Sequence, residues 1–339
     1  MSAVKKILVT GGTGYIGSHT VVELLQAGYE VISVDNYANS DPLVYEGIQK
    51  ICGRKPFFEE VDCCDLKALR LLFQKYGQMD AVVHFAASKA VGESVAQPLH
   101  YYRNNIDSLL TLLEIMQEFD TKNLVFSSSC TVYGQAKELP VTEESPTLPA
   151  TSPYGNTKQI NEEIIRDTVA ATSLKAISLR YFNPIGAHPS ALIGELPRGV
   201  PQNLVPVITQ TAMGKRKQLQ IFGNDYKTPD GTCIRDYIYV VDLSKAHVAA
   251  VARLLHDKES PSYEVFNLGT GAGVSVLQLV RAFELVTGKQ LPYKITGRRA
   301  GDVEQIWADP SKANRELQWK ANTPLSTTLE TAWAWEQTM

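Results

Sequence analysis

Tyr154 and Lys158 stand one helical turn apart at the start of a segment with helical periodicity. Ser152 can cap that helix and Pro153 suits its first position, so the tyrosine and the lysine share one face. A phenol titrates near pH ~10, and a base at neutral pH needs its pKa lowered by about 3, roughly 4 kcal/mol of preferential stabilisation of the anion. A close ammonium group acts in that direction. The pair therefore indicates a tyrosine general base, although a packed tyrosine beside a solvated lysine is also common.

Three hydroxyl groups follow a predicted strand. Ser127, Ser128 and Ser129 end an apolar run that begins at Leu124. In doubly wound folds, ligands bind at the carboxyl ends of parallel strands, and hydroxyls there can relay or stabilise a proton transfer. Serines at a strand end also form turns, and only one of the three need be catalytic.

A glycine-rich loop follows the first apolar run of the chain. Gly12, Gly14 and Gly17 match the pattern Gly-x-Gly-x-x-Gly. Gly11, Gly14 and Gly17 match its variant Gly-x-x-Gly-x-x-Gly. Such glycines permit a tight turn and place a pyrophosphate at the positive N-terminus of the next helix. Asp35 ends the next apolar run, 18 residues after Gly17. A carboxylate there accepts hydrogen bonds from the adenosine ribose and repels a 2′-phosphate, which favours NAD over NADP.

The segments that must position these groups alternate between short apolar runs and helical periodicity. The predicted strands are residues 7–9, 31–35, 81–86, 124–129 and 176–182. One helical stripe ends at Gly28, and another helix follows Asn104 and Asn105. This alternation predicts an α/β fold, a Rossmann-type doubly wound parallel sheet.

The chain length of 339 residues allows one large domain or two modest ones, at roughly 150 residues per domain. Around Gly186, prolines and glycines make an irregular segment that is too long for a mere connector. We place the domain change there. Residues 1–183 are the predicted dinucleotide-binding domain, and residues 184–339 form a smaller mixed α/β substrate-binding domain, with some elements crossing between the two.

Composition excludes several classes of function. Lys+Arg 33 against Asp+Glu 36 give a net charge of −3, so a nucleic-acid partner is not expected, and the basic run at 215–217 is more simply a solvated turn. No apolar stretch suits a membrane helix, and the first strand leaves no room for a signal peptide before it. Five cysteines without Cys-x-x-Cys suit reduced thiols better than disulfides or a metal site. We expect a cytoplasmic protein without metal or membrane association.

The glycine loop, the serine strand end and the Tyr154–Lys158 pair together resemble the extended short-chain dehydrogenase/reductase superfamily. Within it, the chain resembles the UDP-glucose/UDP-galactose 4-epimerase family over essentially its whole length. The segments that carry this resemblance are GGTGYIGSHT at 11–20, HFAA at 84–87, KAVGES at 89–94, YFNP at 181–184, GAH at 186–188, IFGNDY at 221–226, RDY at 235–237 and RRAGD at 298–302.

The resemblance implies that UDP-galactose and UDP-glucose are interconverted with a tightly held NAD. Tyr154 would take the proton of the sugar 4-hydroxyl while hydride passes from C4 to the nicotinamide. The 4-keto sugar would then turn about its bond to the diphosphate, and hydride would return to its other face. Lys158 would lower the pKa of the tyrosine and bind the nicotinamide ribose, and Ser129 would hydrogen-bond the 4-oxygen.

The resemblance also implies binding residues and, commonly in this family, a homodimer. The implied cofactor contacts are Gly11, Gly14, Tyr15, Ile16, Gly17, Asp35, Asn36, Asn39, Ser40, Asp62, Cys63, Phe85, Ala86, Ala87, Lys89, Asn104, Ser127, Tyr154, Lys158 and Tyr181. The implied UDP-hexose contacts are Lys89, Ser129, Tyr154, Phe182, Asn183, Asn203, Leu204, Gln220, Phe222, Arg235, Arg299 and Asp302. Two arginines can bind a diphosphate through paired donors. Without the resemblance, Asp62 could almost equally be a carboxylate in a surface turn.

Two alternatives fit the residues less well. A nucleotide-sugar 4,6-dehydratase starts with the same oxidation but needs further acid/base groups, usually an acidic pair after the serine, where this chain has Cys130 and Thr131. A catalytically silent dinucleotide-binding protein of the same fold would not need Tyr154 and Lys158. The resemblance implies that the size of the residue at position 306 decides whether N-acetylated sugars fit. Ile306 is intermediate between the large aromatic and the small residue found there in the family, so the sequence leaves this question open.

Overall fold

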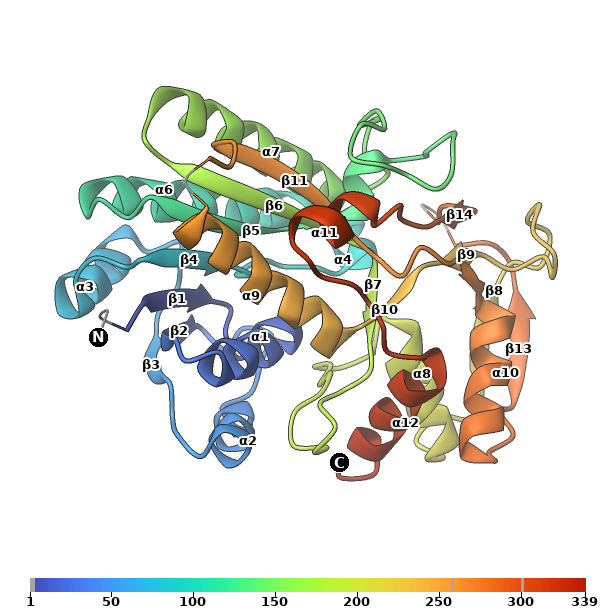
Figure 1. The fold of residues 1–339 in the computed structure, drawn as a ribbon. Coiled ribbons are helices and arrows are strands. Elements are labelled where there is room, and N and C mark those ends of the chain that lie inside the picture. The colour runs from blue at the N-terminus through green and yellow to red at the C-terminus, as the bar shows by residue number, and fades with distance from the viewer. Residues whose placement is uncertain (1–3, 258, 300–301) are drawn as a thin grey trace.

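A seven-stranded parallel sheet forms the centre of the computed structural model, which describes residues 4–257, 259–299 and 302–339 (Figure 1). The strand order is β11-β6-β5-β4-β1-β2-β3. The strands are β1 (Lys6–Thr10), β2 (Glu30–Asp35), β3 (Phe57–Glu60), β4 (Ala81–His84), β5 (Asn123–Ser129), β6 (Lys175–Tyr181) and β11 (Tyr263–Leu268). The predicted doubly wound fold is confirmed. Because the order reverses at β1 and β4, a ligand crevice is expected at their carboxyl ends.

Alternating side chains of the strands contribute to two separate cores. In β1, Ile7 and Val9 face one core and Leu8 faces the other, the period of two expected for a strand buried on both faces. The helices on the Ile7 side are α1 (Tyr15–Gln26), α2 (Leu43–Cys52) and α9 (Val240–His256), and those on the Leu8 side are α3 (Leu66–Tyr76), α6 (Ser108–Glu118) and α7 (Pro153–Ala171). Helices therefore cover both faces of the sheet.

The helix predicted after Asn104 and Asn105 is α6, and further helical turns lead into it. The short helices α4 (Val91–Ala96) and α5 (Pro98–Tyr102) precede a π-helical turn, η1 (Arg103–Asp107), which runs directly into α6. Asn105 is buried in this turn, and its Nδ2 donates to the carbonyl oxygen of Ser88 and to Thr157 Oγ1, both at 3.0 Å. The bonds tie the wide turn to the segment after β4 and to α7, an arrangement that an apolar pattern does not reveal.

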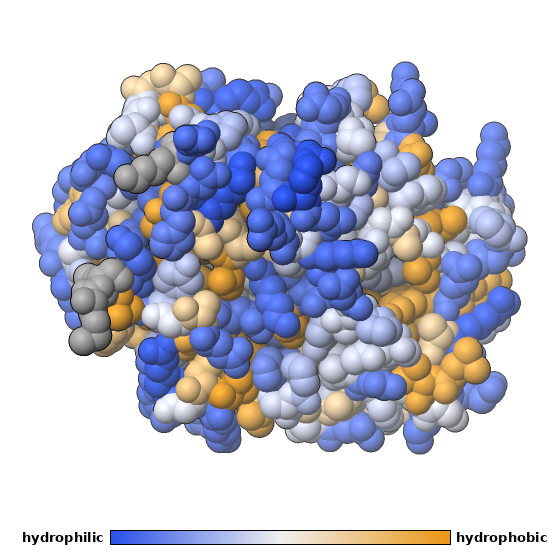
Figure 2. Space-filling model, in the orientation of Figure 1, coloured by the Kyte–Doolittle hydropathy of each residue, from blue (hydrophilic) through white to orange (hydrophobic). Residues whose placement is uncertain are grey.

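A smaller group of elements follows residue 183. β7 (Asn183–Ile185) pairs with β10 (Tyr237–Tyr239), β8 (Leu219–Phe222) with β13 (Tyr293–Thr296), and β9 (Ile234–Arg235) with β12 (Val274–Ser275) and β14 (Gln305–Ile306). The helices α8 (Leu204–Ala212), α10 (Val276–Thr287) and α12 (Leu325–Glu336) share an apolar core of their own. On the face drawn in Figure 2, which is largely hydrophilic, hydrophobic residues gather at the lower right over this group.

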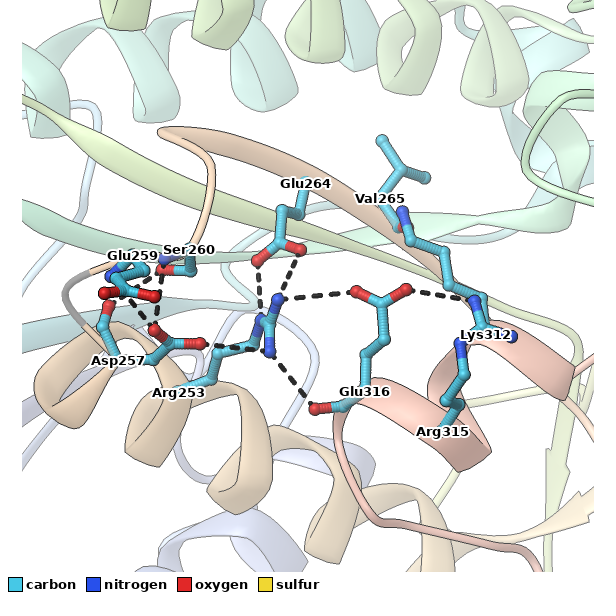
Figure 3. A network of polar contacts seen from close by, with 9 residues as sticks. All are labelled: Arg253, Asp257, Glu259, Ser260, Glu264, Val265, Lys312, Arg315 and Glu316. Carbon is cyan, nitrogen blue, oxygen red and sulfur yellow. Dashed lines mark hydrogen bonds and ion pairs between the residues drawn. The ribbon is translucent and has the colours of Figure 1, made fainter.

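Two elements from the second half of the chain, α9 and β11, belong to the layers of the large sheet. β11 pairs with β6, and α9 packs against α1. The guanidinium of Arg253 in α9 binds the carboxylate of Glu264 in β11 at 2.7 and 2.9 Å, and it donates to the carbonyl oxygen of Glu316 in α11 (Ser311–Glu316) at 3.2 Å (Figure 3). These two elements therefore cross the division at residues 183 and 184, which stays a prediction.

Within the described ranges, no helix combines the length and the apolarity needed to cross a membrane. The same residues contain no group of three or more His, Cys, Asp or Glu side chains that could hold a metal ion. All five cysteines are free thiols.

Candidate active site

Tyr154 and Lys158 lie in the first turns of α7, beside the end of β5. The Ser152 hydroxyl accepts a hydrogen bond from a first-turn N–H at 3.2 Å, and Pro153 takes the first helical position. Lys158 Nζ donates to the carbonyl oxygen of Ser127 at 2.7 Å and lies 5.9 Å from the centre of the Tyr154 ring. The helix and the strand thus bring the tyrosine, the lysine and the serines together.

Burial dominates the electrostatics of this pair. It raises the pKa of Tyr154 to about 12, although the residue keeps a partly exposed surface, and the side chain of Ser129 opposes the rise. It also lowers the pKa of Lys158 to about 7, against the opposing effect of Glu162. We predicted a lowered pKa for Tyr154, but the protein groups alone raise it. The cost of removing the phenolate from water outweighs the groups that stabilise its charge.

The three serines at the end of β5 have different partners. The Ser127 hydroxyl is hydrogen-bonded to the Tyr181 hydroxyl, and the Ser128 hydroxyl donates to Glu162. Ser129 Oγ accepts from the backbone N–H of Thr131 at 3.2 Å and acts on the pKa of Tyr154. Ser129 is therefore the serine placed to share a hydrogen-bonding partner with the tyrosine.

The glycine loop packs closely on the segment that follows β4. Gly11 has φ +67°, and a Cβ on it would lie 2.9 Å from the backbone nitrogen of Ala86. A Cβ on Gly17 would lie 2.1 Å from the carbonyl oxygen of Gly11. Gly14 is the N-cap of α1, and no side chain caps this helix. The loop thus leaves the positive end of a helix without a side-chain partner at the crevice.

Asp35 ends β2 beside this loop and is buried. Its Oδ2 accepts from the backbone N–H of Thr13 at 3.2 Å, and its Oδ1 accepts from the N–H of Tyr37 and the hydroxyl of Ser40, both at 2.9 Å. Three donors therefore fix the carboxylate. Of its predicted neighbours, Cys63 is buried, Asn39 is exposed, and Asn36 Nδ2 reaches Asp62 Oδ2 at 3.3 Å.

Lys89 and Asn203, which are far apart in the sequence, meet at a third residue. The carboxylate oxygen Oε1 of Glu195 accepts from Lys89 Nζ at 3.1 Å and from Asn203 Nδ2 at 2.5 Å. Lys89 Nζ also lies 5.6 Å from the centre of the Tyr15 ring, and the Tyr15 hydroxyl donates to the carbonyl oxygen of Gly186 at 2.6 Å. Glu195 was not predicted from the sequence, because nothing local marks a carboxylate as the partner of two distant side chains.

Two arginines converge on one carboxylate in the smaller group of elements. Arg299 Nη2 lies 2.8 Å and Arg235 Nη2 lies 3.8 Å from Asp302 Oδ1. The Arg299 guanidinium also lies 5.6 Å from the centre of the exposed Phe222 ring. Gln220 is exposed on the same strand, two residues before Phe222. Residues 300 and 301 of the RRAGD segment lie outside the described residues.

This arginine cluster adjoins the serine strand end. Arg235 lies near enough to lower the pKa of Cys130, the residue after Ser129, although burial raises that pKa to about 12 overall. Ile306 pairs with Arg235 across β14 and β9 and is buried in an apolar cluster with Phe182. The remaining predicted contacts line neighbouring segments. They are Ile16, Phe85 and Ala87, all half-buried, with Asn104 in η1, Asn183 in β7 and Leu204 at the start of α8.

Comparison with known proteins agrees with this arrangement. Residues 8–332 match the protein family described as GDP-mannose 4,6 dehydratase. The chain is 52% identical to UDP-glucose 4-epimerase 2 of Arabidopsis thaliana over 335 residues, 98% of this chain and 95% of that one. It is also 52% identical to UDP-glucose 4-epimerase of Homo sapiens over 340 residues, 98% of this chain and 97% of that one. The chain belongs to the UDP-glucose 4-epimerase family.

The fold of this epimerase family member is also that of a solved relative. The crystal structure of UDP-glucose 4-epimerase from Bifidobacterium longum, in complex with NAD+ and UDP, superposes with a TM-score of 0.95 at 47% identity, and the match covers 98% of each chain.

The residues at the crevice fit NAD. The uncapped start of α1 can receive a pyrophosphate, and the contact between Gly11 and Ala86 leaves no room for a Cβ in the loop that shapes this cradle. The fixed carboxylate of Asp35 suits ribose hydroxyls and disfavours a 2′-phosphate.

Proposed function

We propose that this chain interconverts UDP-galactose and UDP-glucose by reversible oxidation at C4 of the sugar, with NAD as its cofactor. The observation that carries the proposal is the meeting of Tyr154, Lys158 and Ser129 at the carboxyl edge of the sheet. The arginine cluster of Arg235 and Arg299 adjoins this edge, which suits a substrate with a reactive hydroxyl and a diphosphate.

When bound, NAD supplies the oxidising and reducing capacity at C4. The start of α1 would hold its pyrophosphate, Asp35 its adenosine ribose and Lys158 its nicotinamide ribose. Lys158 can serve two partners, because an ammonium group has three N–H donors and the Ser127 carbonyl oxygen uses one of them.

Tyr154 transfers the proton in both directions of the reaction. Its phenolate accepts the proton of the sugar 4-hydroxyl as C4 is oxidised, and its phenol returns a proton to the 4-oxygen as C4 is reduced. Ser129 hydrogen-bonds the 4-oxygen. The positive charge of Lys158 stabilises the phenolate, and burial strengthens this attraction because water screens it less.

Inversion requires that the diphosphate stays bound while the sugar turns. Arg235 and Arg299 hold the diphosphate through paired donors, and Phe222 offers an aromatic surface to the uracil. The oxidised sugar can then rotate about its bond to the diphosphate and present its other face at C4. Asn183, Asn203 and Asp302 supply further polar contacts.

The 4,6-dehydratase reaction is not favoured by the residues that follow Ser129. That reaction must also remove a proton from C5 and expel the 6-hydroxyl, which needs additional acid/base groups. The 3-10 turn η2 (Cys130–Tyr133) carries no carboxylate, and burial raises the pKa of the Cys130 thiol to about 12. A thiol with that pKa is a poor base at neutral pH.

We also propose a cytoplasmic homodimer. Large apolar side chains are exposed on α4, α5 and α6, where Val95, Leu99 and Leu110 are 62%, 78% and 40% exposed. α4 and α5 pack against α7, so a second copy seated on this face would bury apolar surface next to the catalytic helix. Sedimentation equilibrium should give a dimer that Leu99→Glu weakens, whereas a wild-type monomer at micromolar concentration would contradict this.

The reaction itself is tested by incubating the purified protein with UDP-galactose and no added reductant. We expect UDP-glucose to form until the two sugars reach equilibrium. Unchanged UDP-galactose with a correctly folded, NAD-loaded protein would refute the proposed function.

A further inference from the structure

A buried ion pair lies one helical turn beyond Lys158 in α7. Glu162 shares the inward face of the helix with Lys158, and the two residues are 2% and 3% exposed. Arg180 of β6, which is 4% exposed, binds both carboxylate oxygens of Glu162, with Nε to Oε1 at 2.9 Å and Nη2 to Oε2 at 2.5 Å. The Ser128 hydroxyl also donates to Oε1. Three donors thus fix this carboxylate below the catalytic lysine.

A contribution to stability does not by itself explain why Glu162 and Arg180 form a buried ion pair. Removing two charges from water is costly, and apolar side chains of similar volume often hold two elements together as well as a buried ion pair does. The pair is nevertheless extended by further polar contacts, since Arg180 Nη1 donates to the Tyr133 hydroxyl at 3.0 Å, and that hydroxyl donates to Asn267 Oδ1 at 2.6 Å. The position of the carboxylate next to Lys158 suggests a role in the reaction.

We propose that Glu162 is a positioning residue for the reaction, the buried counter-charge that favours the ammonium form of Lys158 near neutral pH, with its carboxylate held by Arg180 and Ser128. This inference rests on the proposed function for the role of Lys158. The charge state of Lys158 itself can be measured independently.

The other groups around Lys158 do not replace this counter-charge, and the guanidinium of Arg180, bound to Glu162, is a positive charge that disfavours the ammonium form. The phenol of Tyr154 and the backbone carbonyl of Ser127 are neutral, and burial, with a smaller effect of Lys158, lowers the pKa of His84 in β4 to about 3, so the imidazole is neutral at pH 7. Burial lowers the pKa of Lys158 to about 7, and Glu162 opposes that effect. Loss of the carboxylate therefore moves the lysine pKa below 7 and leaves a neutral amine at physiological pH.

The pH dependence of the rate distinguishes this role from a structural one. At low pH the lysine is protonated with or without Glu162, so the two enzymes should have similar rates. As the pH rises, the variant loses its ammonium ion first, and the ratio of wild-type to variant kcat grows until both lysines titrate in parallel. Each unit by which the lysine pKa falls gives about a tenfold ratio at that plateau.

The test is kcat with UDP-galactose from pH 5 to pH 8.5 for wild type and Glu162→Gln, which keeps the side-chain shape. We expect a ratio of at least about tenfold at pH 7.5 that shrinks to less than about threefold at pH 5. Tyr133→Phe is the matched control, because it removes a hydrogen bond to Arg180 from the same network but no charge. Its ratio to wild type should not change with pH.

A second measurement follows the lysine directly. In protein labelled with 13C-lysine, the Lys158 signal, assigned by its loss in Lys158→Met, should titrate at a lower pH in Glu162→Gln than in wild type. If the unpaired Arg180 prevents folding of Glu162→Gln, the double variant E162Q/R180M is compared instead with the single variant R180M, because those two proteins differ only in the Glu162 carboxylate. An unchanged lysine pKa, or a kcat ratio independent of pH, overturns the inference. A wild type without epimerase activity would instead overturn the proposed function, and the titration would still decide the charge of Lys158.

Discussion

Lys158 Nζ is hydrogen-bonded to the carbonyl oxygen of Ser127 at 2.7 Å, so the lysine of α7 is anchored to the strand that carries Ser129. This bond fixes the distance between the helix and the end of β5. The Tyr154 ring, 5.9 Å from the same Nζ, is held by the same helical turn. The three groups proposed for catalysis thus lie on two elements that this hydrogen bond joins.

Replacing the proposed base should separate cofactor binding from turnover. Tyr154→Phe removes the phenolic hydroxyl but keeps the ring, so we expect the variant to retain NAD while kcat falls about 10²- to 10⁴-fold, the usual contribution of a general acid/base group. Bound NAD is measured after denaturation, and kcat with UDP-galactose. A rate within a few-fold of wild type would mean that another group is the base.

Buried histidines should make the protein less stable in acid. Burial, and to a lesser extent Lys158, lowers the pKa of His84 to about 3, whereas an unfolded histidine titrates near 6.5. Between these values only the unfolded chain binds the proton, so the free energy of unfolding falls as the pH drops below about 6.5. Urea titrations should show a loss of about 2 kcal/mol from this residue between pH 7 and pH 5. His84→Gln should reduce the pH dependence by that amount; an identical slope would show that His84 is not responsible.

Cofactor choice should depend on the charge of Asp35. Asp35→Asn keeps the shape of the side chain but removes the negative charge that repels a 2′-phosphate, so we expect weaker retention of NAD and a larger ratio of NADP to NAD after incubation with both. The control is Asp62→Asn, which removes a carboxylate next to Asn36. If Asp62→Asn changed the ratio and Asp35→Asn did not, the ribose assignment would be wrong.

The Arg253 contacts in Figure 3 should stabilise the joint between α9, β11 and α11. Arg253→Met leaves the buried Glu264 carboxylate without its partner, and breaking such a pair costs about 3–5 kcal/mol. Arg70→Met, which breaks an exposed pair with Glu118, should cost less than about 1 kcal/mol. The free energies of unfolding in urea compare the two, and equal losses would contradict a structural role for Arg253.

The sheet and the glycine loop could be predicted because their signals are local. The strand that ends at Asp35 is a short apolar run, and the glycines of the loop sit at fixed spacing from it. The π-helical turn at Asn105 could not be predicted, because the Asn105 side chain bonds to residues outside the turn. These partners are Ser88 and Thr157, and Thr157 is 52 residues away in the sequence. The pairing of β11 with β6 is equally non-local, so the sequence predicted that some elements cross between the two domains but not that α9 and β11 are among them.

The site shows the same division between local and distant signals. The helical spacing of Tyr154 and Lys158 made them predictable from the sequence. Glu162 lies another four residues along, so its place on the inward face of α7 could also have been predicted. Glu195 had no such signal, because its contacts with Lys89 and Asn203 join segments on both sides of residue 183.

The most direct test of the central claim is the fate of deuterium placed at C4 of UDP-galactose during turnover in ordinary water. If C4 is oxidised and reduced within one site, the hydrogen removed from C4 is the one returned, and we predict UDP-glucose that retains its deuterium at C4. Product that carries hydrogen from water at C4 would contradict reversible oxidation at that carbon.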